Sequence, residues 1–323
     1  MPSRYDRVAD GDSAVKAVLE MFVTSTGDAA RGQRVVRWRN GVAALVFGFA
    51  LAGCSTISGI WNDDDGGSTI QPAASDGTAT NGETAEKLFL EGQVKMHEGK
   101  YRDGAKKFEE IERQFPYSSL ARRGILMTAY AHYQRNQYDD SILAAKRYIT
   151  LYPGNKDAAY AYYLIGLSYY EQITDVGRDQ QVTEKALEAL TEVERRFPDS
   201  EYARDAKQKA LLARDHLAGK EMKVGRYYLT RQSYVAAINR FRKVVTDYQT
   251  TSHTPEALER LTEAYMALGI QGEAQTAAAI LGHNYPDSQW YKDAYTLLKS
   301  DGLEPRENKE SWMSRAWKSV SIF

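Results

Sequence analysis

The sequence is poor in cysteine, in proline and in net charge. Its 323 residues include one cysteine and eight prolines, and 42 basic residues almost balance 43 acidic ones. A single cysteine excludes an intrachain disulfide and a zinc site built from several thiolates. A formal charge of −1 argues against nucleic-acid binding through overall positive charge. What is left is an ordinary globular chain, long enough for one or two domains with hydrophobic cores.

Motifs for catalysis are also missing. The five histidines form no HExxH or HxH pair, and the sequence has no GxxxxGK[ST] phosphate loop, no GxGxxG after a strand and no GxSxG elbow. Neighbouring glutamates such as Glu109 and Glu110 are typical of solvated helix faces. We therefore expect a binding protein that is not an enzyme, with no metal site and no cofactor apart from covalent lipid.

No hydrophobic run is long enough to span a bilayer. The longest one extends from Val42 to Ala52, shorter than the roughly 20 residues that a transmembrane helix needs. Positive charge before a short apolar core and small residues is typical of a secretion signal. The residues ahead of this signal are unusual, so the start could be Met1 or Met21. Four arginines supply the charge: Arg31, Arg34, Arg37 and Arg39.

The end of the apolar run predicts lipidation. Leu51-Ala52-Gly53-Cys54 resembles the bacterial lipobox, in which the thiol receives a diacylglycerol, the peptide is cut before it, and the new amino group is acylated. Three acyl chains anchor a protein stably. Ser55, rather than Asp, fits sorting to the outer membrane. The alternative is an ordinary signal peptide beside a chance cysteine.

Composition then divides the rest of the chain. The stretch after the lipobox is rich in Gly, Ser, Thr, Asp and Ala and is typical of a flexible tether. Helical periodicity follows almost to the C-terminus. The predicted organisation is an N-terminal extension and signal (1–53), a lipidated tether (54–83), N-terminal repeats one to three (84–205), C-terminal repeats four and five (206–299) and an amphipathic tail (300–323).

One short pattern recurs through the helical region. An aromatic residue closes the core of one helix, proline prevents that helix from continuing, and Ser, Asp or Asn can cap the next. The prolines are spaced by 37, 45 and 88 residues, so the last gap indicates one concealed unit. The four strings are Phe115-Pro116-Tyr117-Ser118, Tyr152-Pro153-Gly154-Asn155, Phe197-Pro198-Asp199-Ser200 and Tyr285-Pro286-Asp287-Ser288.

The units resemble the tetratricopeptide repeat, a helix–turn–helix of 34 residues. Small residues at Gly92 and Gly104 would let the two helices of the first unit approach, and Tyr101 begins its second helix. The third unit carries about eight extra residues, around Asp175 to Gln181. We expect an all-α fold, a tetratricopeptide-repeat solenoid of about five helical hairpins, with a concave face formed by the first helices. An unrelated bundle of α-hairpins is the alternative.

The predicted concave face is rich in tyrosine. Tyrosine offers rigid apolar area and a hydroxyl that can meet peptide amides, so these residues predict a groove for an extended peptide. Arg123 lies near this groove and could hold a carboxylate. The alternative is that most of the rings pack between repeats. The predicted groove residues on the first helices are Phe89, Met96, Leu126, Tyr130, Tyr133, Tyr160, Tyr163 and Tyr170.

The tail forms a separate amphipathic segment. Trp312, Met313, Ala316, Trp317 and Val320 fall on one face of a helix, and basic residues occupy the others. Three interpretations remain open. The helix could cap the last repeat, dock a partner, or lie in a membrane interface.

The lipobox, the tether and five repeats together resemble the BamD family of outer-membrane assembly lipoproteins. Three stretches carry this resemblance beyond the generic repeat, and it covers roughly residues 84 to 298. The long N-terminal extension and the two-tryptophan tail depart from it. The three stretches are YYLIGLSYY at 162–170, DVGRDQ at 175–180 and FPDSEYA at 197–203.

The resemblance implies a scaffold on the periplasmic face of the outer membrane, within the β-barrel assembly machine. Its N-terminal repeats would receive the C-terminal targeting strand of unfolded barrel proteins. Its C-terminal repeats would dock a periplasmic domain of BamA, with Arg240 at the contact. Trp312 and Trp317 are the predicted docking residues if the amphipathic tail binds a partner. Other lipoproteins of the machine would be further partners. The alternatives are a repeat lipoprotein of another envelope machine, such as pilus secretion or cell-wall synthesis, and an envelope enzyme with a repeat domain.

Overall fold

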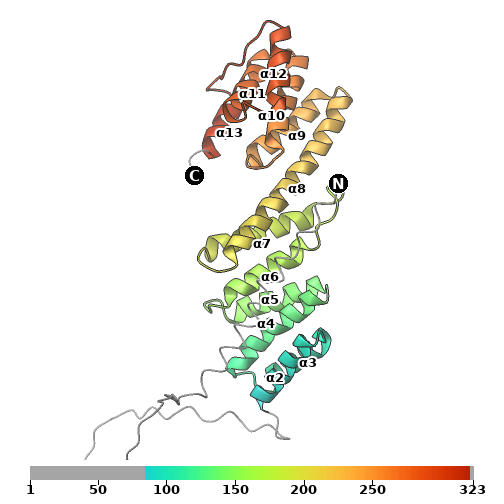
Figure 1. Ribbon diagram of the computed structural model, residues 1–323, viewed down its shortest axis with the longest axis vertical. Helices are drawn as coiled ribbons and strands as arrows, with labels where there is room; N and C mark the ends of the chain where they lie inside the picture. The colour runs from blue at the N-terminus through green and yellow to red at the C-terminus, as the bar shows by residue number, and fades with distance from the viewer. Residues whose placement is uncertain (1–83, 321–323) are drawn as a thin grey trace, which may run out of the picture. The chain divides into compact units, whose positions relative to one another are not determined.

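The computed structural model describes residues 84–320, and every regular element in this range is a helix (Figure 1). The predicted all-α fold is therefore confirmed. None of these helices has the length and apolar character needed to cross a bilayer. The helices are α2 (Ala85–His97), α3 (Tyr101–Gln114), α4 (Ser119–Gln134), α5 (Tyr138–Leu151), α6 (Ala158–Tyr170), α7 (Gln181–Arg196), α8 (Ala203–Thr230), α9 (Tyr234–Asp247), α10 (Thr254–Ala267), α11 (Gln271–Asn284), α12 (Gln289–Ser300) and α13 (Trp312–Val320).

The helices form the five predicted hairpins. The pairs are α2 with α3, α4 with α5, α6 with α7, the second half of α8 with α9, and α10 with α11. Each hairpin also packs on the next, because α3 contacts α4, α5 contacts α6 and α7 contacts α8. The first helices touch as well: α2 meets α4, α4 meets α6 and α6 meets α8. Stacking therefore covers the apolar faces that a single hairpin would leave open.

Close approach within a hairpin depends on a small residue that faces a large one. A Cβ added at Gly92 would lie 2.6 Å from the ring of Phe108 on the partner helix. The fourth unit repeats this arrangement, since a Cβ at Gly225 would lie 2.4 Å from Phe241. Both distances are too short for real atoms, so only glycine lets these helices pack as they do. The predicted role of Gly92 is confirmed.

Four of the hairpin turns share one geometry. The first helix ends, the second residue after it takes a left-handed backbone conformation, and the second helix follows. In the first turn Gly99 has φ 73°, and the amide of Lys100 donates to the carbonyl of Lys95 at 2.9 Å. This is a Schellman motif, which satisfies carbonyls left open at the helix end. In the other three of these hairpin turns the left-handed residue is Asn136, Gln232 or Gly269.

The aromatic-Pro strings end and begin helices, but their capping differs from unit to unit. Ser118 and Ser288 accept backbone amides of the helices that follow, at 3.2 and 3.1 Å, as predicted. Asn155 instead accepts the amide of Asp157, just before α6. The Ser200 hydroxyl donates backwards to the carbonyl of Phe197, so α8 begins without a side-chain cap.

Helix α8 is shared by two units. Its 28 residues pack against α7 at the start and against α9 at the end. The predicted division of the repeats between residues 205 and 206 lies inside this helix. The extra residues of the third unit form the loop between α6 and α7, as predicted. Lys220 of α8 reaches this loop and donates to the carbonyl of Gly177 at 3.0 Å.

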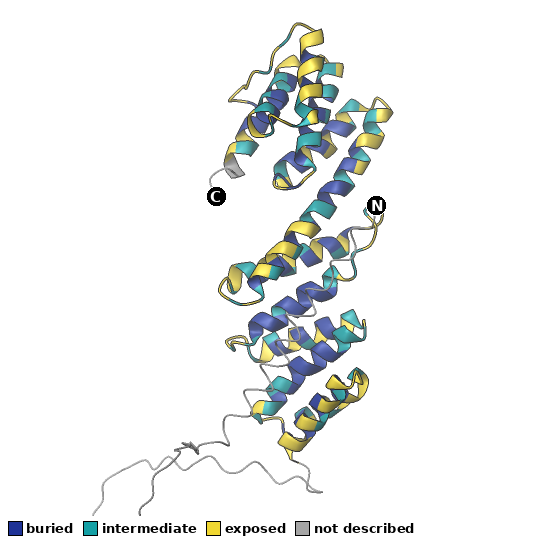
Figure 2. Cartoon of the chain, viewed as in Figure 1, coloured by how far each residue is buried: buried dark blue, intermediate teal, exposed yellow. Residues whose placement is uncertain are grey.

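A hydrophobic core runs from the second half of α8 to α13 (Figure 2). Large buried side chains such as Phe241, Leu258 and Leu261 fill it. Helix α12 packs on α10 and α11, while α13 returns to pack on α9 and α11. Met313 of α13 is completely buried in this core. The tail is therefore part of the folded body between residues 84 and 320.

Candidate functional site

Five tyrosines gather where the first helices of the second, third and fourth units meet. We call this set the tyrosine cluster: Tyr130 and Tyr133 of α4, Tyr160 and Tyr163 of α6, and Tyr202 just before α8. The Tyr202 ring lies 5.2 Å from Tyr163 in a stacked arrangement and 5.2 Å from Tyr160 in a tilted one. Such ring pairs add stabilisation beyond the area they bury. These ring contacts join α6 to the residue that directly precedes α8.

The hydroxyl groups of the cluster meet carboxylates at its edge. The Tyr163 hydroxyl donates to Asp205 Oδ2, and the Tyr133 hydroxyl donates to Glu171 Oε1 at 3.4 Å. Burial raises the pKa of Tyr163 and Tyr133 far above its usual range, and the neighbouring carboxylates raise it further. Burial also raises the pKa of Tyr160. These hydroxyls therefore remain neutral donors at any physiological pH.

A cation completes this edge. Lys209 of α8 forms an ion pair with Asp205 at 2.9 Å, and its ammonium lies 5.8 Å from the centre of the Tyr170 ring. Asp205 therefore bridges a tyrosine hydroxyl and a lysine. The edge offers a carboxylate, an ammonium and an aromatic face within one small area, a mixture suited to peptide recognition.

Burial revises the predicted groove. Tyr163 is only 1% exposed, and Tyr130 and Tyr160 are also buried. These rings pack between repeats, which was the alternative interpretation. Tyr133, Tyr170 and Arg123 keep partial exposure. An open groove lined by all the predicted residues is therefore not what the structure contains.

The predicted groove residues of the first unit belong to its core. Phe89 is buried, with its ring 5.4 Å from that of Phe108 on α3. Met96 is buried against the partner helix, because its sulfur occupies the space beside Gly104. Leu126 of α4 is likewise buried. Apolar side chains on a first helix point inward here because the neighbouring helices cover them.

The predicted docking residue Arg240 lies on the surface of α9. Its guanidinium pairs with Glu221 Oε2 of α8 at 3.2 Å; the arginine side chain is 45% exposed and the glutamate 13%. A cavity of about 240 Å³ beside it is lined by α8 and α9 residues, including Lys243. Arg240 is thus held in one place by a mostly buried carboxylate and remains accessible.

The two predicted docking tryptophans pack against the last repeats. The Trp312 indole Nε1 donates to the Tyr265 hydroxyl at 3.1 Å, and the guanidinium of Arg242 lies 4.5 Å above its ring. Trp317 is half-buried beside the same core. These contacts are the packing expected of a helix that caps the last repeat.

Sequence reasoning missed Tyr202, Asp205 and Lys209. All three lie at the start of α8, where the repeat pattern is hidden by the continuous helix. The string FPDSEYA does contain Tyr202, but nothing in its spacing shows that the ring returns to α6. No group of three or more potential metal ligands occurs in the part of the chain that the structure describes. The predicted lipidation residue Cys54 lies outside the described residues.

The stacked hairpins and the tyrosine cluster between them define a helical-repeat protein of the tetratricopeptide type. A family model described as an outer membrane lipoprotein, YfiO, matches residues 81–281. The chain belongs to this family of outer membrane lipoproteins.

Its relatives include proteins called outer membrane protein assembly factor BamD. The one from Caulobacter vibrioides is 51% identical over 220 residues, which cover 68% of this chain and 72% of the relative. The one from Rickettsia prowazekii is 40% identical over 258 residues, which cover 80% and 96%. Among solved structures, a thermophilic tetratricopeptide-repeat protein of Thermus thermophilus is 18% identical, with coverage of 66% and 98% and a TM-score of 0.30.

Proposed function

We propose that this protein is a scaffold of the outer-membrane β-barrel assembly machine that performs no catalysis. The observation that carries this proposal is its 51% identity to an outer membrane protein assembly factor of Caulobacter vibrioides. The match extends over the repeat region, where the stacked hairpins can bind other polypeptides. The protein would hold its partners in place and transfer no chemical group.

A pull-down tests this function. The tagged full-length chain is purified from its own cells in mild detergent, and co-purifying proteins are identified by mass spectrometry. We expect BamA and other lipoproteins of the same machine. Co-purification with pilus-secretion or cell-wall enzymes in the absence of BamA would instead favour the alternative scaffold.

We propose that acyl chains on Cys54 hold the protein at the periplasmic face of the outer membrane. The support is the string Leu51-Ala52-Gly53-Cys54, together with family membership among outer membrane lipoproteins. Cys54→Ala removes the thiol that accepts the lipid. The variant should move from the outer-membrane fraction to the soluble periplasmic fraction. A variant that stays in the membrane would contradict lipid anchoring at this residue.

We propose that the exposed edge of the tyrosine cluster receives the C-terminal strand of unfolded barrel proteins. Such strands carry alternating aromatics and a terminal carboxylate. Tyr133 and Tyr170 offer aromatic area that is partly exposed. Arg123, which is partly exposed near the start of α4, would add positive charge for the terminal carboxylate. The buried tyrosines hold this edge rigid, so little entropy is lost when a strand binds.

Crosslinking of a barrel C-terminal peptide tests this edge. Tyr133→Ser should reduce crosslinking to the full chain because it removes a partly exposed ring. The matched control is Tyr117→Ser, which removes a fully exposed ring in the turn before α4. Circular dichroism checks that both variants keep their helicity. Equal crosslinking of both variants and the parent would remove the edge as the strand site.

We propose that Arg240 contributes to docking a periplasmic domain of BamA. Arg226 gives a closely matched control, since both arginines are 45% exposed and pair with a glutamate that is 13% exposed. Arg240→Ala should reduce co-purification of BamA, and Arg226→Ala should not. An equal effect of both substitutions would assign the loss to stability and contradict docking through Arg240.

A further inference from the structure

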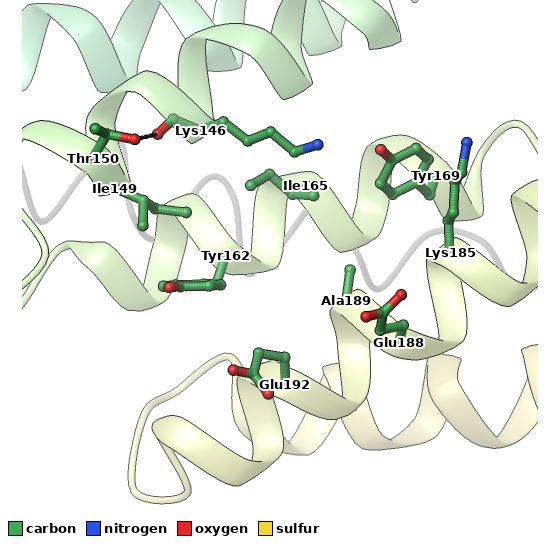
Figure 3. Close-up of a pocket in the computed structure, with 10 residues that line it drawn as sticks. All are labelled: Lys146, Ile149, Thr150, Tyr162, Ile165, Tyr169, Lys185, Glu188, Ala189 and Glu192. Carbon is green, nitrogen blue, oxygen red and sulfur yellow. Dashed lines mark hydrogen bonds between the residues drawn. The ribbon is translucent and has the colours of Figure 1, made fainter.

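An open groove lies on the second and third units, and none of the residues proposed above lines it. Figure 3 shows its ten lining side chains, which enclose about 680 Å³. Helices α5 and α7 form its walls and α6 forms its floor. The floor residues are Tyr162, Ile165 and Tyr169; the walls are Lys146, Ile149 and Thr150 on one side and Lys185, Glu188, Ala189 and Glu192 on the other.

The same place in the fourth and fifth units is occupied by α13. That helix packs on α9 and α11, which are the second helices of their units, just as α5 and α7 are in theirs. The correspondence extends to single residues. Tyr169 lies 16 residues after Pro153, and Tyr265 lies 16 residues after Gln249, which replaces proline in the fourth string. The open groove is therefore the repeat equivalent of a groove that already holds a helix.

Helix α13 shows how such a groove binds. Trp312 donates from its indole to Tyr265 at 3.1 Å and lies under the guanidinium of Arg242 at 4.5 Å. The residue before it, Ser311, donates to Glu273 Oε2 at 2.7 Å. An aromatic anchor and one polar contact thus fix the helix on its groove.

Helix α13 and the residue before it contact three groove residues: Tyr265, Arg242 and Glu273. The open groove has a residue of the same type at the first two of these positions and one of opposite charge at the third. Tyr169 corresponds to Tyr265, which α13 contacts. Lys146 corresponds to Arg242, because Lys146 lies seven residues before Pro153 and Arg242 lies seven residues before Gln249. Lys185 stands in place of Glu273, thirteen residues before the next proline. Its ammonium lies 6.0 Å from the centre of the Tyr169 ring, so positive charge sits beside the aromatic floor.

We propose that this groove docks an amphipathic helix of a partner protein, which places a tryptophan between Lys146 and Tyr169 and a carboxylate against Lys185. The pattern on the occupant is an acidic residue followed directly by tryptophan. Helix-in-groove binding of this kind depends on a few anchors at helical spacing. The site is independent of the proposed function, because neither the tyrosine cluster nor Arg240 lines it.

Charge argues against a second copy of this chain as the occupant. The chain's own α13 carries Ser311, with no negative charge, at the position that would face Lys185. The groove itself is balanced in charge, with two lysines and two glutamates. In a second copy, α13 is also held in that copy's own core, where Met313 is completely buried, so it is not available to fill the groove. A partner helix with an acid at that position satisfies Lys185, and α13 does not.

A designed peptide tests the groove on the purified full-length chain. Its sequence is that of residues 307–318 with Ser311→Asp, labelled for fluorescence anisotropy and carrying a photocrosslinker in place of Met313. We expect saturable binding and crosslinks to α5, α6 or α7. The same peptide with Trp312→Ala should bind about tenfold more weakly or worse, since it lacks the anchor.

Reversing the charge of Lys185 tests its predicted contact, and the same change at Lys106 is the control. Lys185→Glu should weaken binding about tenfold, and a peptide with Ser311→Lys should regain the loss. Lys106→Glu, the same change at an exposed position of α3, should leave binding unchanged. Lys185 is itself exposed, so its replacement leaves the fold intact, which circular dichroism verifies.

Four outcomes would overturn the proposal. They are no binding up to about 1 mM peptide, equal affinity for the parent and Lys185→Glu, crosslinks on α9 or α11 alone, and self-association of the chain that Lys185→Glu abolishes. The last would show that a second copy occupies the groove.

Discussion

At the scale of single residues, Glu259 stands out as a carboxyl group inside the helix stack. It is 6% exposed on α10. Burial raises its pKa to about 7; Arg260 opposes this shift, while Glu263, Asp293 and Glu256 reinforce it. The raised pKa means that the folded protein holds a proton that the unfolded chain releases near pH 4.5. The protonated Glu259 therefore contributes its full share of folding stability below pH 4.5, and this contribution is lost as the pH rises through 7.

Replacing this carboxyl group by an amide should therefore flatten the pH dependence of stability. We expect Glu259→Gln to raise the free energy of unfolding at pH 8 by on the order of 2 kcal/mol and to change it little at pH 5. Urea unfolding at the two pH values measures this difference. Glu109→Gln, the same change at an exposed position of α3, is the control. An equal effect at both pH values would show that the carboxyl group is already ionised at pH 5.

The tyrosines show what a sequence can and cannot say about a candidate site. Helical spacing correctly places Tyr130, Tyr160 and Tyr163 on first helices. It does not show whether the neighbouring unit covers them, because that depends on where Tyr202 returns in space. Arg240 and Glu221 are 19 residues apart, so their pairing also depends on how α8 and α9 cross. The sequence predicts which residue types lie on the first helices. Whether these side chains are exposed depends on how the neighbouring helices pack over them.

At the scale of elements, the turns between helices use one backbone conformation with different residues. Gly99 and Gly269 take φ 73° without strain, because glycine has no Cβ. Gln232 takes φ 60° at the equivalent place. A left-handed conformation costs an ordinary residue about 1–2 kcal/mol. The fourth hairpin therefore carries a cost that the first and fifth avoid.

Exchanging these residue types should change stability in opposite directions. We expect Gln232→Gly to raise the free energy of unfolding by about 0.5–1 kcal/mol, after the greater freedom of the unfolded glycine is subtracted. Gly99→Ala should lower it by about 1 kcal/mol. Thermal unfolding followed by circular dichroism measures both. A destabilising Gln232→Gly would mean that the glutamine side chain stabilises the turn by more than its backbone costs.

Element boundaries were predictable where the chain carries strong local signals. Proline after an aromatic ends α3, α5, α7 and α11, and this follows from the missing amide alone. The same rule does not predict that α8 is one continuous helix. The only proline between Pro198 and Pro286 is Pro255, near the start of α10, so no proline marks a boundary inside α8 between the units that share it. Gly219 and Gly225 lie within this helix without ending it. Each packs where an added Cβ would crowd a neighbouring side chain, so these glycines serve close packing and do not mark a helix end.

At the scale of the whole described chain, the tail helix α13 closes the hydrophobic core of the fourth and fifth units. Met313 is fully buried among residues of the fourth and fifth units. Gln249 donates to the carbonyl of Ala316 at 3.1 Å, and the amide of Asn308 donates to Thr276 at 3.2 Å. Backbone and side-chain bonds therefore fasten the tail at several points. The sequence left three roles open for this helix, and the contacts favour a cap.

Removing the buried side chain of the tail should weaken the C-terminal core. We expect Met313→Ala to lower the free energy of unfolding by about 2–4 kcal/mol, because it leaves a cavity under α13. Arg315→Ala, an exposed change on the same helix, should alter it by less than about 0.5 kcal/mol. Tryptophan emission should report earlier exposure of Trp312. Equal stability of the two variants would show that α13 is loosely attached in solution.

The sharing of α8 between two units has a consequence for how the protein can be divided. A cut near the start of this helix removes the surface that α7 packs on, and a cut near its end removes the surface that α9 packs on. A cut in the middle gives each fragment a newly exposed helix end that the intact chain does not have. The two units that share α8 are therefore difficult to separate into independent fragments.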